Sequence, residues 1–192
     1  MAHASKKAQT VSIIRFKATL HRPAGTAKGG SWTFLNLPKD ASEKLPSRSM
    51  TSVEGAFNGF PFQATLEPDG QGGHWLRVDQ KLREAADAKA GDLVTLEIAP
   101  AAVEPEPEMP ADLHMALAAA APLALATWSD ITPIARRDWI HWITSGKRAE
   151  TRAKRIGVAC SKLAAGDRRP CCFDRSGMYS KSLSCPVPDD DA

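Results

Sequence analysis

The fold is decided by residues 53–66, which read VEGAFNGFPFQATL. At the centre of this stretch stands Asn58-Gly59, a pair that favours a two-residue β-hairpin turn because both turn positions need a positive φ angle. After the turn, apolar and polar side chains alternate from Phe60 to Leu66, the pattern of a strand with one buried face. Pro61 cannot donate a backbone hydrogen bond and favours an edge or a bulge. The stretch therefore predicts an antiparallel hairpin.

The sequence on both sides of the hairpin has the same β character. Apolar residues alternate with polar ones at 14–20 and again at 94–98, and a short strand is predicted at 74–78. A further strand is expected at 31–37, before Pro38, and Asp79 is placed to cap a short helix at 80–88. These elements predict a small β-barrel with a capping helix over residues 11–100, after a disordered start at residues 1–10.

Beyond residue 100 the pattern changes from strands to helices. Residues 101–110 are rich in proline and glutamate, which alternate at 104–108, and this composition is typical of a stiff, extended linker. Helices are expected at 111–121, from Thr132-Pro133 to about Ser145, and at 149–165, and they define a helical module at 111–166. Residues 167–192 hold few large apolar groups and predict a disordered tail. The chain is therefore expected to have an α+β fold, with a barrel followed by a helical module.

Composition limits the class of protein further. The net charge is +3, but the segment from Ile134 to Lys181 holds 12 Lys and Arg residues against 4 Asp and Glu residues, a local net charge of +8. No apolar run reaches the roughly 18 residues of a membrane span, and the first ten residues do not lead into the apolar segment of a signal peptide. We therefore expect neither a transmembrane segment nor a signal peptide, and a cytoplasmic protein.

Cysteine usage agrees with that compartment. The four cysteines lie in the last third of the chain, at Cys160, Cys171, Cys172 and Cys185. A disulfide framework would distribute them through the fold, so we interpret them as reduced thiols. Cys171-Cys172 also lacks the two-residue spacer of a zinc knuckle, so neither a metal site nor a cofactor is expected.

Several motifs are familiar in their order and spacing. They are WTF at 32–34, LP at 37–38, GAFNGFPF at 55–62, GHWLRV at 73–78 and KLREAA at 81–86. Through them, residues 16–98 resemble the DUF1905 family. Residues 111–166 resemble the helical YdeI/OmpD-associated family through DL at 112–113, AL at 116–117, WI at 139–140 and KRAETRAKRI at 147–156. The resemblance implies a closed double-split, AbrB-like barrel, then a helical module with a role in bacteriocin protection. It implies no catalytic residue, and Arg77 and Asp79 depart from the family's usual proline and asparagine.

Five residues of the barrel are candidates for a ligand site. His74 titrates near neutral pH and follows a Gly-Gly loop, yet it is in phase with inward residues, which predicts a hydrogen bond to a loop carbonyl. Trp32, Trp75 and Arg77 either line a shallow ligand site or pack the barrel with Arg77 in solvent. Asn58 is a candidate as well, although turn chemistry explains it. No nucleophile and base are recognisably paired, so no catalytic residue is predicted.

The basic helix offers a second surface. Arg148, Arg152 and Arg155 recur at i, i+4 and i+7, which places them on one stripe with Lys147 beside it. Such a stripe can contact nucleic-acid phosphates or an acidic protein surface, or it can be a solvated face. The sequence favours a non-enzymatic binding or stress-protection protein. The alternatives are a nucleic-acid-binding protein, with the AbrB-like barrel as a homodimer platform, and a small-ligand binder or enzyme at the barrel mouth.

Overall fold

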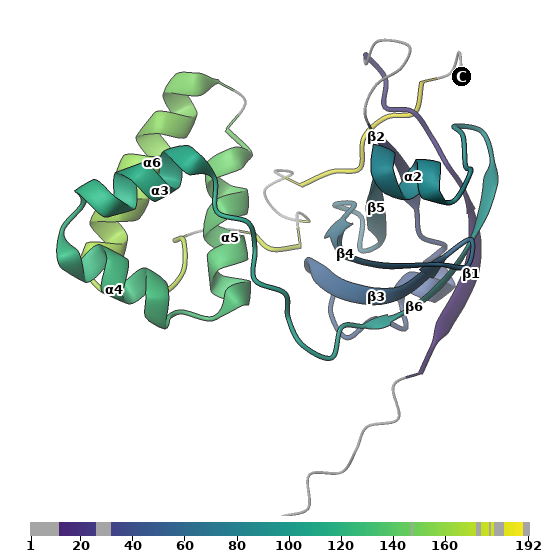
Figure 1. Cartoon of the computed structure of the whole chain (residues 1–192), viewed down its shortest axis with the longest axis horizontal. Coiled ribbons are helices and arrows are strands. Elements are labelled where there is room, and N and C mark those ends of the chain that lie inside the picture. The colour runs from purple at the N-terminus through teal and green to yellow at the C-terminus, as the bar shows by residue number, and fades with distance from the viewer. Residues whose placement is uncertain are drawn as a thin grey trace, which may run out of the picture. The chain divides into compact units, whose positions relative to one another are not determined.

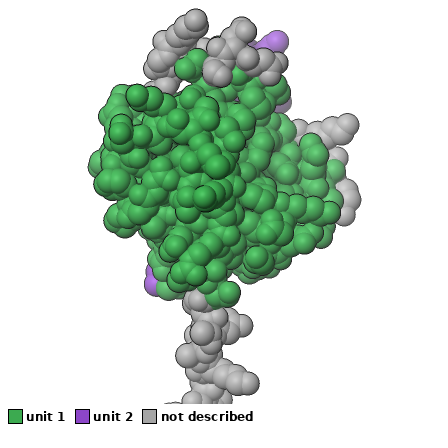
Figure 2. Space-filling view, turned by 90° about the vertical axis from the view of Figure 1, so that its right-hand side faces the viewer, with its two compact units in different colours: residues 1–102, 176–192 green, residues 103–175 purple. Residues whose placement is uncertain are grey.

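The structure is a computed structural model that describes residues 12–25, 32–146, 148–171, 174–176, 178 and 183–189. The chain forms two compact units, shown in Figure 1 and coloured separately in Figure 2. Residues 1–102 together with 176–192 make the first, which we call the β unit. Residues 103–175 make the second, the helical unit. The helical unit is thus inserted, in sequence, between two parts of the β unit.

An antiparallel sheet of six strands forms the β unit. The strands are β1 (Ile14–Thr19), β2 (Trp32–Asn36), β3 (Thr51–Phe57), β4 (Phe60–Pro68), β5 (His74–Asp79) and β6 (Leu93–Pro100). Their order across the sheet is β1-β6-β3-β4-β5-β2. Just past β1, His21 forms an isolated bridge with Phe34 of β2, through backbone N–H to carbonyl bonds of 2.7 and 2.9 Å. The bridge connects the two ends of the strand order, so the sheet is curled.

The predicted hairpin is present. Asn58 and Gly59 join β3 to β4 with φ angles of 48° and 84°, as a turn with two positive φ positions requires. Earlier in β3, a side chain on Gly55 would collide with the backbone carbonyl of Glu97 in β6. Only glycine therefore allows β3 and β6 to pair as closely as they do.

Two short helices accompany the sheet, α1 (Lys39–Ser42) and α2 (Gln80–Ala85). Asp79 caps α2 as predicted, because its carboxylate accepts a hydrogen bond of 2.8 Å from the backbone N–H of Leu82. The inward side chains of all six strands form one hydrophobic core, which includes Leu35, Val53, Leu76 and Leu96. The predicted α+β class, with a curled antiparallel sheet followed by helices, is confirmed.

Within the residues that the structure describes, the helical unit has four helices and a core of its own. The helices are α3 (Ala111–Ala119), α4 (Pro122–Asp130), α5 (Pro133–Thr144) and α6 (Ala149–Ala164). Thr132 caps α5 as predicted, since its hydroxyl accepts a hydrogen bond from the backbone N–H of Ala135. Helix α4 was not predicted from the sequence. Pro122, which ends the preceding alanine-rich segment, is also the first residue of α4, where its missing N–H costs nothing.

The end of the chain differs from the expected disordered tail where the structure describes it. Pro188 forms an antiparallel bridge with Pro23, and Leu183 is only 5% exposed. Backbone hydrogen bonds of 2.8 Å connect Ala24 to Val187 and Asp189 to Arg22. Low apolar content predicted disorder, but backbone pairing with residues 22–24 does not depend on side chains.

Candidate functional site

Aromatic side chains gather on the outward face of β2 and β5. Leu35 and Leu76 point into the core, so their neighbours Phe34, Trp75 and Arg77 point the other way, as does Trp32. Phe34 meets Trp75 edge-on, with ring centroids 6.2 Å apart, and Trp32 lies 6.5 Å from Trp75. The guanidinium carbon of Arg77 lies 4.4 Å from the centroid of the Trp32 ring, in a cation–π contact. We call these four residues the aromatic face.

This outward face is nevertheless mostly buried. Phe34 is 0% and Trp75 5% exposed, so both are as buried as core residues, although they lie outside the cluster of inward side chains. The C-terminal residues 183–189, which we call the strap, pass beside β2 (Figure 1). The Cys185 thiol donates a hydrogen bond of 2.7 Å to the side-chain carbonyl of Asn36, the residue opposite Trp75 in the β2–β5 register. Trp32 is half-buried and Arg77 is exposed, so one edge of the aromatic face is open to solvent.

An acidic group borders the aromatic face. Glu67 of β4 lies opposite Trp75 in the sheet register, which gives both side chains the same outward direction. Burial raises the pKa of the Glu67 carboxyl, and the positive charge of Arg77 opposes that rise. Burial also raises the pKa of the Cys185 thiol, to about 11, and the negative charges of Asp69 and Glu67 add to the rise. The thiol is therefore protonated at neutral pH and can act as the hydrogen-bond donor to Asn36.

His74 does not belong to this site. Its side chain points inward and is 1% exposed. The ring Nε2 lies 3.1 Å from the backbone carbonyl of Ser49, and the ring Nδ1 lies 2.5 Å from the hydroxyl of Ser42. Because a carbonyl only accepts, Nε2 carries the proton and Nδ1 accepts from Ser42. Burial lowers the pKa of His74, which is thus a neutral residue that connects α1 and a loop to β5.

Asn58 is also separate from the aromatic face. It lies in the turn between β3 and β4, where its side-chain carbonyl accepts a hydrogen bond of 2.8 Å from the backbone N–H of Thr95. The structure thus brings together Trp32, Trp75 and Arg77 of the five predicted ligand residues. It separates His74 and Asn58 from them.

The predicted basic stripe is largely engaged in contacts within the helical unit. Arg152 forms two hydrogen bonds to the carboxylate of Asp112 in α3, of 2.5 and 2.9 Å. Arg155 donates to the backbone carbonyl of Trp142, at 2.5 Å, and lies over the Trp142 ring. Arg148 is exposed at the N-terminus of α6, and Lys147 lies outside the described residues. Arg152 and Arg155 therefore fasten α6 to α3 and α5.

Other arginines of the helical unit have similar roles. Arg136 and Arg137 of α5 pair with Glu106 and Glu104 of the predicted linker, so the linker is fastened to the unit rather than fully solvated. Asp138 is 1% exposed, and Arg169 and Arg175 contact its carboxylate at 2.5 and 3.2 Å. Burial raises the pKa of Asp138, whereas the neighbouring guanidinium groups lower it. These pairs hold the segment after α6 against α5.

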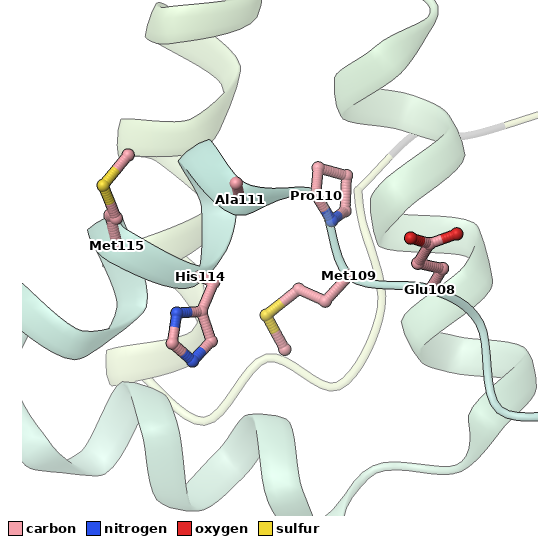
Figure 3. A pocket seen from close by; sticks show the side chains of 6 residues that line it. All are labelled: Glu108, Met109, Pro110, Ala111, His114 and Met115. Carbon is pink, nitrogen blue, oxygen red and sulfur yellow. The ribbon is translucent and has the colours of Figure 1, made fainter.

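A shallow hollow of about 490 Å³ lies at the start of α3 (Figure 3). It is lined by Glu108, Met109, Pro110, Ala111, His114 and Met115. Its walls are mainly apolar, and none of the residues predicted for a site lines it. Across the described ranges, no group of three His, Cys, Asp or Glu side chains is arranged to hold a metal ion. Within the same ranges, no helix is long and apolar enough to cross a membrane.

Part of the site was not predicted from the sequence. Asn36 and Glu67 were not predicted, although strand alternation gives both the same outward direction as Trp75. The strap residues Leu183 and Cys185 were assigned to a disordered tail. An available signal was the presence of Trp32, Phe34 and Trp75 at outward positions, because large aromatic residues there require either a covering segment or a ligand.

Comparison with known families agrees with the two-unit organisation. Residues 16–98 match the family described as a domain of unknown function, DUF1905. Residues 106–166 match the family described as "Bacteriocin-protection, YdeI or OmpD-Associated". No curated protein matches the chain. Both matches agree with the motifs quoted from the sequence, and their order is the same. The chain thus matches the DUF1905 family over residues 16–98, followed by the YdeI/OmpD-associated family over residues 106–166.

Proposed function

We propose that this chain is a non-enzymatic binding protein that serves in bacteriocin protection and binds its ligand on the aromatic face. The observation that carries the proposal is the set of large aromatic side chains on the outward side of β2 and β5. Phe34 and Trp75 are buried but lie outside the cluster of inward side chains, and Trp32 at the edge of the face is only half-buried. The family description of the helical unit supplies the context of bacteriocin protection.

The chemistry of the aromatic face suits binding. Trp32 presents a half-buried indole, and the exposed Arg77 guanidinium lies above it. Tryptophan and arginine are the residue types that contribute most binding energy in protein interfaces, because they combine a large contact area with polar groups. The carboxyl of Glu67 adds an acceptor beside them. In contrast, both ring nitrogens of His74 are hydrogen-bonded in the protein interior, which supports a structural role.

A protection assay tests this proposal. A bacteriocin-sensitive strain would express the wild-type chain, Trp32→Ala, Arg77→Ala or the control Arg15→Ala, and minimal inhibitory concentrations would be measured for a panel of purified peptide bacteriocins. Arg15 is an outward arginine on β1, paired with Glu97, so its replacement is a matched change away from the aromatic face. We expect the wild type and Arg15→Ala to protect, and the other two variants to lose most of the protection. Equal protection by all four chains would exclude the aromatic face, and no protection by any would refute the bacteriocin role.

Nucleic-acid binding through α6 is the alternative that the basic stripe indicated. The cations on which it now depends are Arg148 and Lys154, which are exposed, whereas Arg152 and Arg155 contact other parts of the helical unit. Fluorescence anisotropy of labelled duplex and single-stranded DNA, titrated with salt, tests it. Salt-sensitive binding that is lost in Arg148→Ala would support this alternative, and no binding at low salt would remove it.

A further inference from the structure

We propose that the strap is an intramolecular ligand of the aromatic face, and that the external ligand is an extended peptide that replaces it. The inference rests on the proposed function, because it concerns the same face and names the chemistry of what binds there. The starting observation is that residues 183–189 run beside β2 and form hydrogen bonds to its residue Asn36 and to residues 22–24. A surface that accepts one peptide segment in this way can accept another with matching features.

The backbone contacts of the strap are independent of its sequence. The N–H of Ala24 donates to the carbonyl of Val187, and the N–H of Asp189 donates to the carbonyl of Arg22, both at 2.8 Å. These two bonds flank the bridge between Pro23 and Pro188 and use the N–H of neither proline. An incoming peptide can form the same bonds with any side chains. This is recognition by strand addition, in which the main chain provides affinity and a few side chains provide specificity.

Three side chains of the strap indicate the specificity. Leu183 is 5% exposed, and Cys185, two residues later, donates to Asn36. In an extended chain, residues two apart point to the same side, so both can face the protein. Asp189 adds an ion pair of 3.8 Å with Arg22. The favoured ligand is therefore a peptide with an aliphatic residue, a small hydrogen-bond donor two positions later and an acidic residue four positions after that.

Covalent attachment gives the strap an advantage over such a peptide. A tethered segment acts at an effective concentration on the order of 1 mM. To occupy the face, a free peptide must be present above this effective concentration multiplied by a ratio. The ratio is the dissociation constant of the peptide divided by that of the strap. The strap therefore lowers the apparent affinity for external peptides and restricts binding to sequences that fit better than residues 183–189.

The test uses a fluorescent peptide of residues 183–192 and full-length chains. In Leu183→Asp a charge is placed at a buried strap position, which should release the strap. The matched control is Val187→Asp, the same kind of change at a strap position that is 70% exposed. Leu183 is buried but lies outside both core clusters, and Val187 is exposed, so neither change is made within those clusters. By anisotropy we expect the peptide to bind Leu183→Asp at least 10-fold more tightly than it binds the wild type or Val187→Asp.

A second readout follows the strap itself. Iodoacetamide modification of Cys185, resolved by peptide mass spectrometry, should be slow in the wild type and Val187→Asp, and at least 10-fold faster in Leu183→Asp. A peptide carrying the Leu183→Asp change should bind none of the chains. Equal peptide binding to all three chains, or binding to none of them, would overturn the inference, as would equal rates of Cys185 modification.

The two proposals can fail separately. If Leu183→Asp binds the strap peptide but no chain protects against a bacteriocin, the strap inference stands and the bacteriocin role falls. If protection requires Arg77 but the strap peptide binds the wild type and Leu183→Asp alike, the aromatic face is the ligand site and the strap does not compete for it.

Discussion

Replacing Ser42 by alanine should destabilise the β unit by removing a single hydrogen bond. The hydroxyl of Ser42 lies 2.5 Å from Nδ1 of His74, and both residues are buried, at 5% and 1% exposed. In Ser42→Ala the lone pair of Nδ1 has no donor. The other ring nitrogen is already committed to the carbonyl of Ser49, so the ring cannot turn to compensate without losing that bond.

The magnitude follows from the burial of the acceptor. A buried polar group without a partner costs about 1–3 kcal/mol, and we take about 2 kcal/mol for this closed environment. That free energy corresponds to an increase of about 30-fold in the unfolded fraction of the β unit. Native-state hydrogen exchange measures this change directly, since the slowest amides exchange through global opening. The amides of β6 should exchange about 30-fold faster, whereas those of α6, in the other unit, should not change.

Ser49→Ala is the matched control. It is the same chemical change at a serine whose backbone carbonyl, and not its hydroxyl, contacts His74. Its side chain is half-buried but bonds only to the exposed Ser47 nearby, so we expect a change within about 0.5 kcal/mol. If Ser42→Ala and Ser49→Ala accelerate exchange in β6 by the same factor, the hydrogen bond to Nδ1 does not stabilise the fold as argued.

Three further predictions use the same exchange measurement. Gly55→Ala should destabilise the β unit by about 3 kcal/mol because its methyl group meets the backbone of β6. Gly157→Ala, on an open face of α6, should instead stabilise the helical unit by about 0.5–1 kcal/mol, and equal effects of the two changes would contradict the packing argument. Arg152→Ala should lower the free energy of unfolding of the helical unit by about 1 kcal/mol, because its two hydrogen bonds to Asp112 in α3 are lost. Arg148→Ala should lower it by less than about 0.5 kcal/mol, and a larger effect of Arg148→Ala would show that the Arg152 pair is not stabilising. The pKa of His74 is lowered in the folded state, so the unfolded chain takes up the proton first and the free energy of unfolding falls as pH falls below about 6.5. His74→Gln should lose this part of the pH dependence between pH 7.5 and 5.5, and an unchanged pH dependence would refute the role given to His74.

Local signals in the sequence predicted the β unit well. The hairpin at 53–66 was predicted because Asn58-Gly59 requires a particular turn, and the turn fixes the pairing of the residues around it. Strand alternation placed His74 on the inward side, and the hydrogen bond to the Ser49 carbonyl agrees with the expected loop contact. These features depend on neighbouring residues, so a sequence contains the information needed to predict them.

The candidate site was predicted only in part because it depends on contacts between distant residues. Trp75 and Arg77 are two residues apart in one strand, but their association with Glu67 and the strap depends on which strands become neighbours. Periodicity gives the face of a strand but not the identity of what covers that face. For the same reason His74 was grouped with Trp75, its neighbour in sequence, although successive side chains of a strand lie on opposite sides.

The basic segment shows that a charge count does not measure the charge available to a partner. Sequence composition gave a local net charge of +8 for residues 134–181. Among the described residues, Arg152, Arg168 and Arg169 each contact a carboxylate of the same unit, and Arg155 contacts a carbonyl. A polyanion would have to replace these partners, at the cost of the contacts that hold α6 and the following segment. Only the cations that contact phosphate contribute to the salt dependence of DNA binding. Each contact adds about −0.9 to the slope of log affinity against log salt concentration. With Arg148 and Lys154 as the exposed cations of α6, binding through that helix should give a slope near −2, and a much steeper slope would show that the internal pairs open.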